Sequence, residues 1–337
     1  MRKVAGLVMV RNEADIIETF VRYNLRYLDE LIIVLHSPHD DTAKIIEQLR
    51  IEGLPLVIKH NHELGFSKAD WMNKVAREVL ASKRADFLFM LDADEFIKCP
   101  SRAYLDDAIS VIPAGATAAL KWESYVPTPE DANGERNVVK RIQHRVVEET
   151  ARVCKVTLCK RFGGDTSLTI ADGNHAVLCG QGDMWTPVPH VLFRGVSLAH
   201  FPVRSESQLV SKALIGIWSR WVDHGRVDKS TCISNHWLRF YQELIDCGNL
   251  SPERLRDIAG NYGSMQALPQ SNDARALILD PLNVDFDLKY TPASETSSLA
   301  NISRWVEMLI DQPTISIVSE PPRRTPFQAS VARRTNA

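Results

Sequence analysis

The sequence lacks the features that mark membrane-spanning, disulfide-rich and nucleic-acid-binding proteins. No stretch approaches the roughly 18–20 consecutive apolar residues that a membrane-spanning helix requires. The six cysteines form no CxxC pair and have no regular spacing, so we expect free thiols and no disulfide framework. Neither sign of charge dominates, because 40 Lys and Arg stand against 42 Asp and Glu, for a net charge of −2. The chain therefore has no overall positive field that would indicate a nucleic-acid partner.

Two further features are missing near the start of the chain. The first apolar run meets Arg11 too soon to be the apolar region of a signal peptide, so we expect a cytoplasmic protein. Residues 6–15 also lack the glycine-rich, basic loop that cradles phosphate in many nucleotide-binding enzymes. Internal repeats are absent as well.

The chain has 337 residues, of which 45% are hydrophobic and 24% charged, as in a soluble protein with a sizeable core. Its first 125 residues alternate between strand-like and helix-like segments. Asn12 and Ser67 are expected to cap two of the helices, each with an acid three positions later. The strands are expected at residues 4–10, 31–35, 54–59 and 86–91. This order predicts an α/β fold with a doubly wound, mostly parallel sheet.

The rest of the chain is less regular. We expect a strand at residues 116–122, a polar loop at 127–136, and a strand-rich stretch over 138–200 that contains apolar pieces at 153–158 and 191–198. Helices are expected over 205–222 and 234–262. The predicted organisation is a nucleotide-binding and catalytic domain at 1–225 and a helical region for acceptor binding or assembly at 226–318. A disordered basic tail is predicted at 319–337.

The most informative feature is a pair of acids at the end of a predicted buried strand. The apolar run Phe87-Leu88-Phe89-Met90 leads directly into Leu91-Asp92-Ala93-Asp94-Glu95-Phe96. Residues at i and i+2 of an extended chain point to the same side, so Asp92 and Asp94 face one space. In an open α/β sheet, ligands bind beyond the carboxyl ends of the strands. Two carboxylates there suit a hard divalent cation that also holds substrate phosphate.

Three other segments near strand ends are candidates for ligand contacts. The turn with Arg11 and Glu13 ends the first strand, where backbone N–H groups can bind an anion or a base edge, although capping by Asn12 explains the turn equally well. The turn after the second strand offers Asp40 or Asp41 to a base or ribose. Lys68 lies in the first turn of a helix, where a cation is mildly unfavourable, which favours binding of an anion such as a diphosphate, although a solvated lysine explains the position equally well.

Two later segments carry further candidates. Asp172 and His175 flank a glycine, and either could accept a proton from a hydroxyl nucleophile, although an Asp-Gly turn between strands is the plainer interpretation. His200 ends a strand before Pro202, and its imidazole could complete a metal site with the paired acids or have a structural role alone. Arg204 and Lys212 follow, and both could neutralise phosphate.

Together these segments resemble a glycosyltransferase of the GT-A fold, in the family-2-like group, over roughly residues 3–225. The resemblance rests on Arg11-Asn12-Glu13-Ala14-Asp15, Leu91-Asp92-Ala93-Asp94-Glu95-Phe96, Gly173-Asn174-His175 and His200-Phe201-Pro202-Val203-Arg204-Ser205. It implies that Asp92 and Asp94 hold Mn²⁺ or Mg²⁺ and the ribose of a nucleotide-sugar, with His200 as a further ligand. One departure is the turn His36-Ser37-Pro38-His39-Asp40-Asp41, where many relatives have an Asp- and Gly-containing turn that reads the base.

The predicted function is metal-dependent sugar transfer from a nucleotide-sugar to an acceptor hydroxyl, with inversion at the anomeric carbon, in surface polysaccharide or glycoconjugate synthesis. The acceptor is expected to be a glycan or lipid-linked, and the base to be Asp172 or His175. Donor contacts are assigned to Arg11, Glu13, Asp41, Lys68, Asp92, Arg204 and Lys212. The alternatives are a nucleotidyltransferase or a non-catalytic module that binds a sugar nucleotide or a protein. A solvated tail is favoured over weak tail contact with the inner face of a membrane.

Overall fold

The computed structural model describes most of the chain. The described residues are 2–63, 65, 68–82, 84–112, 117–131, 134–149, 154–159, 167–181, 184–224, 235–248, 250–263, 275–294 and 297–310. The predicted cap Ser67 and the whole of the predicted tail, residues 319–337, lie outside these ranges.

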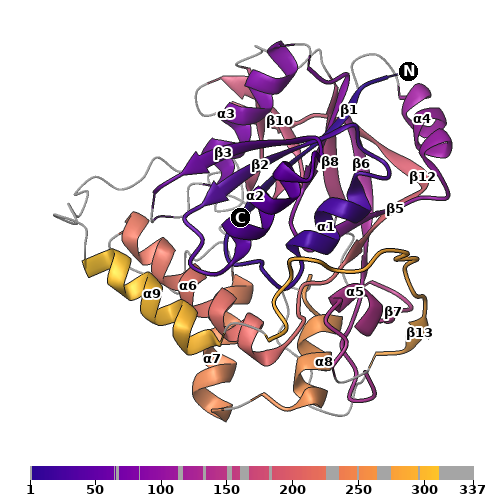
Figure 1. The fold of residues 1–337 in the computed structure, drawn as a ribbon. Coiled ribbons are helices and arrows are strands. Elements are labelled where there is room, and N and C mark those ends of the chain that lie inside the picture. The colour runs from indigo at the N-terminus through magenta and orange to yellow at the C-terminus, as the bar shows by residue number, and fades with distance from the viewer. Residues whose placement is uncertain are drawn as a thin grey trace, which may run out of the picture.

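An eight-stranded sheet forms the centre of the fold, in the order β3-β2-β1-β4-β8-β6-β12-β5 (Figure 1). Its strands are β1 (Val4–Val10), β2 (Glu30–His36), β3 (Leu56–Asn61), β4 (Phe87–Leu91), β5 (Glu95–Lys98), β6 (Thr117–Ser124), β8 (Cys154–Cys159) and β12 (His190–His200). β8 and β5 run against their neighbours, and the other strands of this sheet are parallel to one another. The prediction of an α/β fold with a mostly parallel sheet is therefore confirmed.

Helices cover both faces of the sheet, which explains why β1 and β2 are buried along their whole length. One face packs against α1 (Ile17–Asn24), α2 (Thr42–Ile51) and α4 (Arg102–Ser110). The other face packs against α3 (Lys68–Ala81), whose Met72, Val75 and Val79 are buried as the helical spacing predicts. The alternation of strand and helix in the sequence thus produces the layered core directly.

Smaller elements complete the described chain. A three-stranded sheet contains β9 (Leu168–Ile170), β10 (Val177–Gln181) and β11 (Met184–Pro187), and a short 3₁₀ turn at Asp172–Asn174 joins its first two strands. Short α5 (Val138–Arg141) precedes β7 (His144–Val146), which pairs with β13 (Leu277–Leu279). The remaining helices are α6 (Glu206–His224), α7 (Asn235–Cys247), α8 (Pro252–Gly260) and α9 (Ser298–Ile310). None of the described helices combines the length and apolar character needed to cross a bilayer.

One local prediction is wrong. Asn12 does not cap α1, which begins five residues later at Ile17. Asn12 instead adopts a left-handed backbone with φ of 53°, and its Oδ1 accepts a hydrogen bond from the backbone N–H of His39 at 2.7 Å. Its intended capping-box partner Asp15 pairs with Arg204. Tertiary contacts have therefore replaced the local cap.

The strand order places the site. β1 lies between β2 and β4. After β1 the chain adds β2 and β3 on one side, and it then returns to add β4 on the other side, so a switch point lies between the parallel strands β1 and β4. A crevice forms beyond the carboxyl ends of strands at such a switch point. The segments that begin at Arg11 and Asp92 follow these two strands and meet at this edge.

Candidate active site

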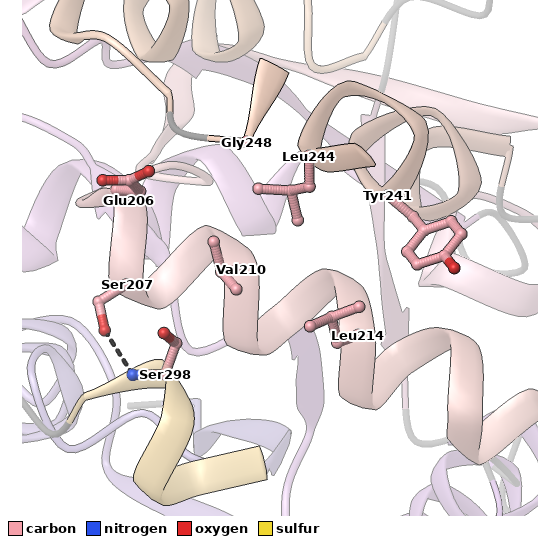
Figure 2. Close-up of a pocket in the computed structure, with 8 residues that line it drawn as sticks. All are labelled: Glu206, Ser207, Val210, Leu214, Tyr241, Leu244, Gly248 and Ser298. Atoms are coloured by element: carbon pink, nitrogen blue, oxygen red, sulfur yellow. Dashed lines mark hydrogen bonds between the residues drawn. The ribbon is translucent and has the colours of Figure 1, made fainter. Parts of the chain in front are cut away.

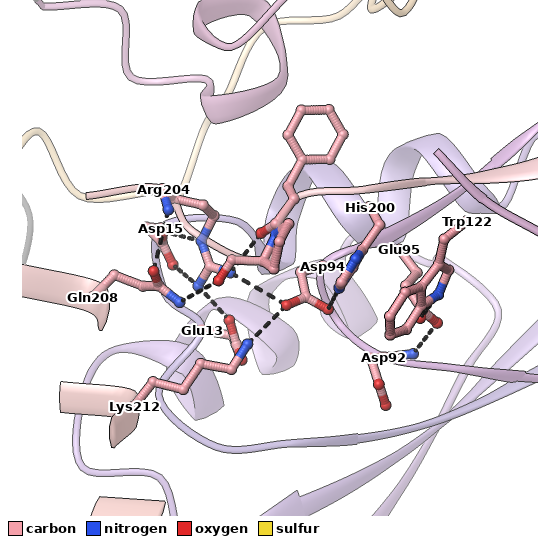
Figure 3. A network of polar contacts seen from close by, with 12 residues as sticks. Glu13, Asp15, Asp92, Asp94, Glu95, Trp122, His200, Arg204, Gln208 and Lys212 are labelled. Carbon is pink, nitrogen blue, oxygen red and sulfur yellow. Dashed lines mark hydrogen bonds and ion pairs between the residues drawn. The ribbon is translucent and has the colours of Figure 1, made fainter. Parts of the chain in front are cut away.

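The pairing of β5 with β12 brings His200 close to the paired acids. β5 begins at Glu95, immediately after the acids, and pairs antiparallel with β12 so that His200 lies opposite Glu95. The backbone N–H of Phe201 also donates to the carbonyl of Asp94 at 2.8 Å. The imidazole Nε2 of His200 consequently lies 3.8 Å from Asp94 Oδ1, as the prediction of a shared site requires (Figure 3).

Arg204 links the end of β1 to the paired acids. Its guanidinium is fully buried and donates to Glu13 Oε2 at 2.5 Å and to Asp15 Oδ2 at 2.6 Å. Its third nitrogen, Nη1, is 3.8 Å from Asp94 Oδ2 (Figure 3). Burial raises the pKa of Glu13 to about 7, against the opposing effect of Arg204. Arg204 therefore serves as the common counter-ion of three acids from two strands.

Lysines from three different elements cover the two aspartates. Lys212 on α6 places its Nζ 2.8 Å from Asp94 Oδ2. Burial alone would raise the pKa of Asp94, but the charge of Lys212 lowers it to about 2. Asp92 is paired on one oxygen with Lys68, from the start of α3, and on the other with Lys155 at 2.5 Å. In this structure Lys68 is paired with Asp92, and its predicted contact with a diphosphate stays a prediction.

Aromatic rings fix the imidazole of His200. Trp122 stacks on it with a centroid distance of 4.1 Å, and Tyr262 contacts it edge-on at 5.5 Å. The indole N–H of Trp122 donates to Glu95 Oε1 at 2.6 Å, while the backbone N–H of Asp92 donates to Glu95 Oε2 at 2.8 Å (Figure 3). Both oxygens of this fully buried carboxyl are occupied, and burial raises its pKa to about 8. Glu95 therefore supports the site from behind and does not face a substrate.

The donor set at Asp94 and His200 fits a divalent cation. Two ligands of one ion each lie about 2.1 Å from it, so a separation of 3.8 Å is within the reach of a shared ion. Burial lowers the pKa of His200 to about 3, so the imidazole is neutral, as a metal ligand must be. Its Nδ1 is buried without a hydrogen-bond partner among the described residues. Within the same residues, however, no group of three or more His, Cys, Asp or Glu side chains is arranged to hold a metal.

The 172–175 loop lies beside these residues. The carbonyl of Gly173 accepts a hydrogen bond from Lys155 at 2.7 Å, which ties the loop to Asp92. Gly173 has a φ of 75°, and a Cβ there would lie 2.7 Å from the ring of His175. The exposed imidazole of His175 contacts Trp122 edge-on at 5.5 Å. Asp172 Oδ1 accepts a hydrogen bond from the backbone N–H of Gly173 at 3.0 Å. Both predicted base candidates are therefore held near the acids through Lys155 and Trp122.

The turn after β1 differs from the expected anion site. The amides of Glu13 and Ala14 already donate to Thr42 Oγ1 at 2.7 Å and to Asp40 Oδ2 at 3.0 Å, so they are not free to bind an anion. The Arg11 guanidinium donates to the carbonyl of His36 at 3.0 Å and to Ser219 Oγ at 2.6 Å. These bonds join the ends of β1 and β2 to each other and to α6.

The turn after β2 separates its two aspartates. Asp40 also accepts from the N–H and the hydroxyl of Thr42, so its carboxylate is committed to the turn. Asp41 is exposed and makes no capping bond to α2. Asp41 is thus the less committed of the two, and its contact with a base or ribose stays a prediction.

Several residues of the site escaped the sequence analysis. Lys155 is the clearest case, because it is 1% exposed yet carries an ammonium group that contacts Asp92, Gly173 and, at 3.5 Å, Glu95. The available signal was a lysine inside the strand-like segment Cys-Lys-Val-Thr-Leu-Cys, since a buried lysine needs an acidic partner. Tyr262 gave no such signal, because its helix end reaches the site only through tertiary packing.

A hollow lies along α6 (Figure 2). It has a volume of about 510 Å³ and lies between α6, α7 and the start of α9, with the lining residues Glu206, Ser207, Val210, Leu214, Tyr241, Leu244, Gly248 and Ser298. Val210 and Leu214 are one helical turn apart and point into it, whereas Lys212 lies on the other face of the helix. The hollow shares no residue with the acidic site.

Comparisons with known proteins give only distant likenesses. No protein-family model matches the chain, and no curated protein sequence matches it either. Among solved structures, TarS residues 1–349 from S. aureus align over 84% of this chain and 100% of that one, with 13% identity and a TM-score of 0.35. A mannosyltransferase from Pyrobaculum calidifontis, in complex with GDP-Man and Mn²⁺, covers 74% of this chain and 77% of its own, with 16% identity and a TM-score of 0.36.

A glucosyl-3-phosphoglycerate synthase from Mycobacterium tuberculosis, in complex with Mn²⁺, UDP and phosphoglyceric acid, covers 36% of this chain and 43% of its own. Its identity is 16% and its TM-score 0.25. Because these TM-scores are below 0.5, the likenesses carry no argument about activity. A function for this chain has to be inferred from its own residues.

Proposed function

We propose that this protein is a metal-dependent glycosyltransferase that moves a sugar from a nucleotide-sugar to an acceptor hydroxyl. The observation that carries the proposal is the position of Asp94 and His200, which face each other at 3.8 Å beyond the carboxyl ends of a doubly wound sheet. That edge is where α/β enzymes bind nucleotides, and this pair of donors suits Mn²⁺ or Mg²⁺.

Each residue of the site has a role in this reaction. Asp94 and His200 would hold the ion, and Asp92 would orient the ribose. A bound divalent cation supplies charge stabilisation for the departing diphosphate. Lys68 and Lys212 provide further positive charge for the same phosphates. Arg204 keeps Glu13, Asp15 and Asp94 in position.

The acceptor side is assigned to the 172–175 loop. Asp172 or His175 removes the proton from the acceptor hydroxyl, whose oxygen attacks the anomeric carbon as the bond to the diphosphate breaks. A single displacement of this kind inverts the anomeric configuration.

Two turns are assigned to the donor. Arg11 would contact the donor from the turn after β1, which it stabilises, and Asp41 would contact it through its exposed carboxylate. The expected acceptor is a glycan or a lipid-linked glycan, and the expected location is the cytoplasm or the inner face of a membrane.

The alternative of a nucleotidyltransferase is weaker on one observation. Such an enzyme would normally bind phosphate at a glycine-rich loop after the first strand. Here the amides of Glu13 and Ala14 are taken up by Thr42 and Asp40. The geometry therefore favours sugar transfer, in which the phosphates would bind the divalent cation that is held at the paired acids.

The test is the release of nucleoside diphosphate from a panel of nucleotide-sugars. The wild-type protein should turn over at least one donor with Mn²⁺ or Mg²⁺ and lose that turnover in EDTA. Asp94→Ala should reduce the rate by on the order of 10²-fold or more, because it removes a ligand of the ion. Turnover that persists in EDTA, or that survives in Asp94→Ala, would show that the metal role is wrong.

A further inference from the structure

The two aspartates at the end of β4 are each already bound to an ammonium group. Lys68 covers Asp92 Oδ1, and Lys212 covers Asp94 Oδ2 at 2.8 Å. Among the described residues no three His, Cys, Asp or Glu side chains are arranged to hold a metal, although Asp94 and His200 lie 3.8 Å apart. Any divalent cation that binds to these carboxylates has to compete with the lysines.

The lysines and the arginine around the acids differ in their freedom to move. Lys155 and Arg204 are buried and have several fixed partners, Gly173 and Glu95 for the lysine and Glu13 and Asp15 for the arginine. The side chains of Lys68 and Lys212 remain 16% and 24% exposed. A lysine ammonium is a point charge on a flexible four-carbon stem, so a partly exposed one can swing to a new partner.

We propose that Lys68 and Lys212 act as placeholders, occupying the carboxylates of Asp92 and Asp94 until a divalent cation and the donor diphosphate bind together, and then moving to the diphosphate. This inference rests on the proposed function and adds a mechanism of binding to it. The two lysines come from separate elements, α3 and α6, so they reach the acids from different sides of the site.

The charge balance gives the proposal its direction. In the free protein Asp92 and Asp94 are already balanced by positive charge, from the partly exposed Lys68 and Lys212 together with the buried Lys155 and Arg204. A divalent cation alone would leave surplus positive charge in a partly buried site, which is unfavourable. A nucleoside diphosphate bound with the cation restores the balance, because its phosphates take both displaced ammonium groups. The cation and the nucleotide should consequently bind with strong positive coupling.

The decisive experiment measures Mn²⁺ and nucleotide separately. Binding of Mn²⁺ alone is followed by the electron paramagnetic resonance signal of the free aqueous ion. Binding of UDP and of GDP, each with saturating Mn²⁺, is followed by calorimetry. The proteins are wild type, Lys68→Met, Lys212→Met and the control Lys74→Met. Lys74 lies on the same helix as Lys68 but is exposed and stacks over Trp71, away from the acids.

The expected effects have opposite signs. Lys68→Met and Lys212→Met should each bind Mn²⁺ alone more tightly, by roughly three- to tenfold, because a competing charge is gone. Each should bind the nucleotide with Mn²⁺ more weakly, by on the order of tenfold, because a phosphate contact is lost. Lys74→Met should behave as wild type in both assays, and the melting temperature of each variant checks that it is folded.

Two results would overturn the inference. One is an unchanged or weakened affinity for Mn²⁺ alone in folded Lys68→Met, which decides the matter even if Lys212→Met fails to fold. The other is tight binding of Mn²⁺ to wild type with no dependence on nucleotide. A third result bears on a different claim: if wild type binds neither UDP nor GDP with Mn²⁺ while the Mn²⁺ affinities change as expected, the proposed function fails and the competition by lysine stands.

Discussion

At the scale of the residue, the site consists of charges that hold one another in place. Arg204 is the centre of this arrangement, since its guanidinium reaches acids that follow β1 and β4. A buried ion network of this kind contributes little net stability as a whole, but the loss of one member leaves the others uncompensated. The order of the site therefore depends on residues that need not touch a substrate.

Arg204→Ala tests this dependence. We expect it to lower the free energy of unfolding by about 3–5 kcal/mol, because Glu13, Asp15 and Asp94 lose their shared partner. The control is Arg50→Ala, which removes an exposed pair with Glu47 and should leave stability nearly unchanged. Urea denaturation of the three proteins at neutral pH measures both changes. A loss in Arg204→Ala no larger than in Arg50→Ala would mean that the network does not depend on Arg204.

The catalytic base is a second question at this scale. If Asp172 is the base, Asp172→Asn should retain donor affinity and slow transfer by on the order of 10²–10⁴-fold. If His175 is the base, the same loss should occur in His175→Ala, while Asp172→Asn should keep a rate close to that of wild type. Single-turnover rates with saturating donor distinguish the two. Rates within a few fold of wild type in both variants would place the base elsewhere.

At the scale of the element, the C-terminal segment at residues 289–291 is bonded to α1. The carboxylate of Glu18, on α1, is buried and accepts backbone N–H bonds from Lys289, Tyr290 and Thr291, each at 2.8 Å. Burial alone would raise the pKa of Glu18, but these three bonds lower it below its ordinary value. One ionised side chain therefore accepts three successive backbone N–H bonds from this segment.

Glu18→Gln should lower stability at pH 7 by about 1.5–3 kcal/mol, the range for hydrogen bonds to a charged group. A lowered pKa means that this contribution is fully present above the model-peptide pKa of 4.5 and is lost as pH falls through the lower folded value. The stability difference between wild type and Glu18→Gln should therefore shrink below about pH 4.5. The control is Glu78→Gln, which changes an exposed acid and should alter the free energy of unfolding little at any pH. A gap that stays constant from pH 7 to pH 3 would contradict the account.

The elements also show how far sequence reasoning reaches. The strands at residues 4–10 and 86–91 were predictable because fully buried parallel strands are continuous apolar runs. β5 was not, because four residues after a pair of acids carry no periodicity. The pairing of β5 with β12, which brings His200 to Asp94, is a long-range contact that local patterns do not encode. Lys155 did carry a local signal, as a lysine inside a strand-like segment, but its partner Asp92 is 63 positions away in the sequence.

At the scale of the whole molecule, the sheet gathers residues that are remote in the sequence. The acids follow β1 and β4, Lys155 comes from β8, His200 ends β12, and Lys212 lies on α6. The C-terminal helices contribute too, because Tyr262 follows α8 and contacts His200. At least one residue of the predicted 226–318 region therefore contacts the site. Truncation of the chain before α7 removes this residue and should disturb the site.

The central claim is that this edge of the sheet binds a nucleoside diphosphate together with a divalent cation. The most direct measurement is the melting temperature of wild type and Asp94→Asn with UDP or GDP, each with and without Mn²⁺. A nucleotide at about 100 times its dissociation constant should stabilise the wild-type protein by about 2.7 kcal/mol, a rise on the order of 5 °C, only when Mn²⁺ is present. Asp94→Asn should show no such rise. An unchanged melting temperature of wild type with both nucleotides and Mn²⁺, or an equal rise in Asp94→Asn, would contradict the claim.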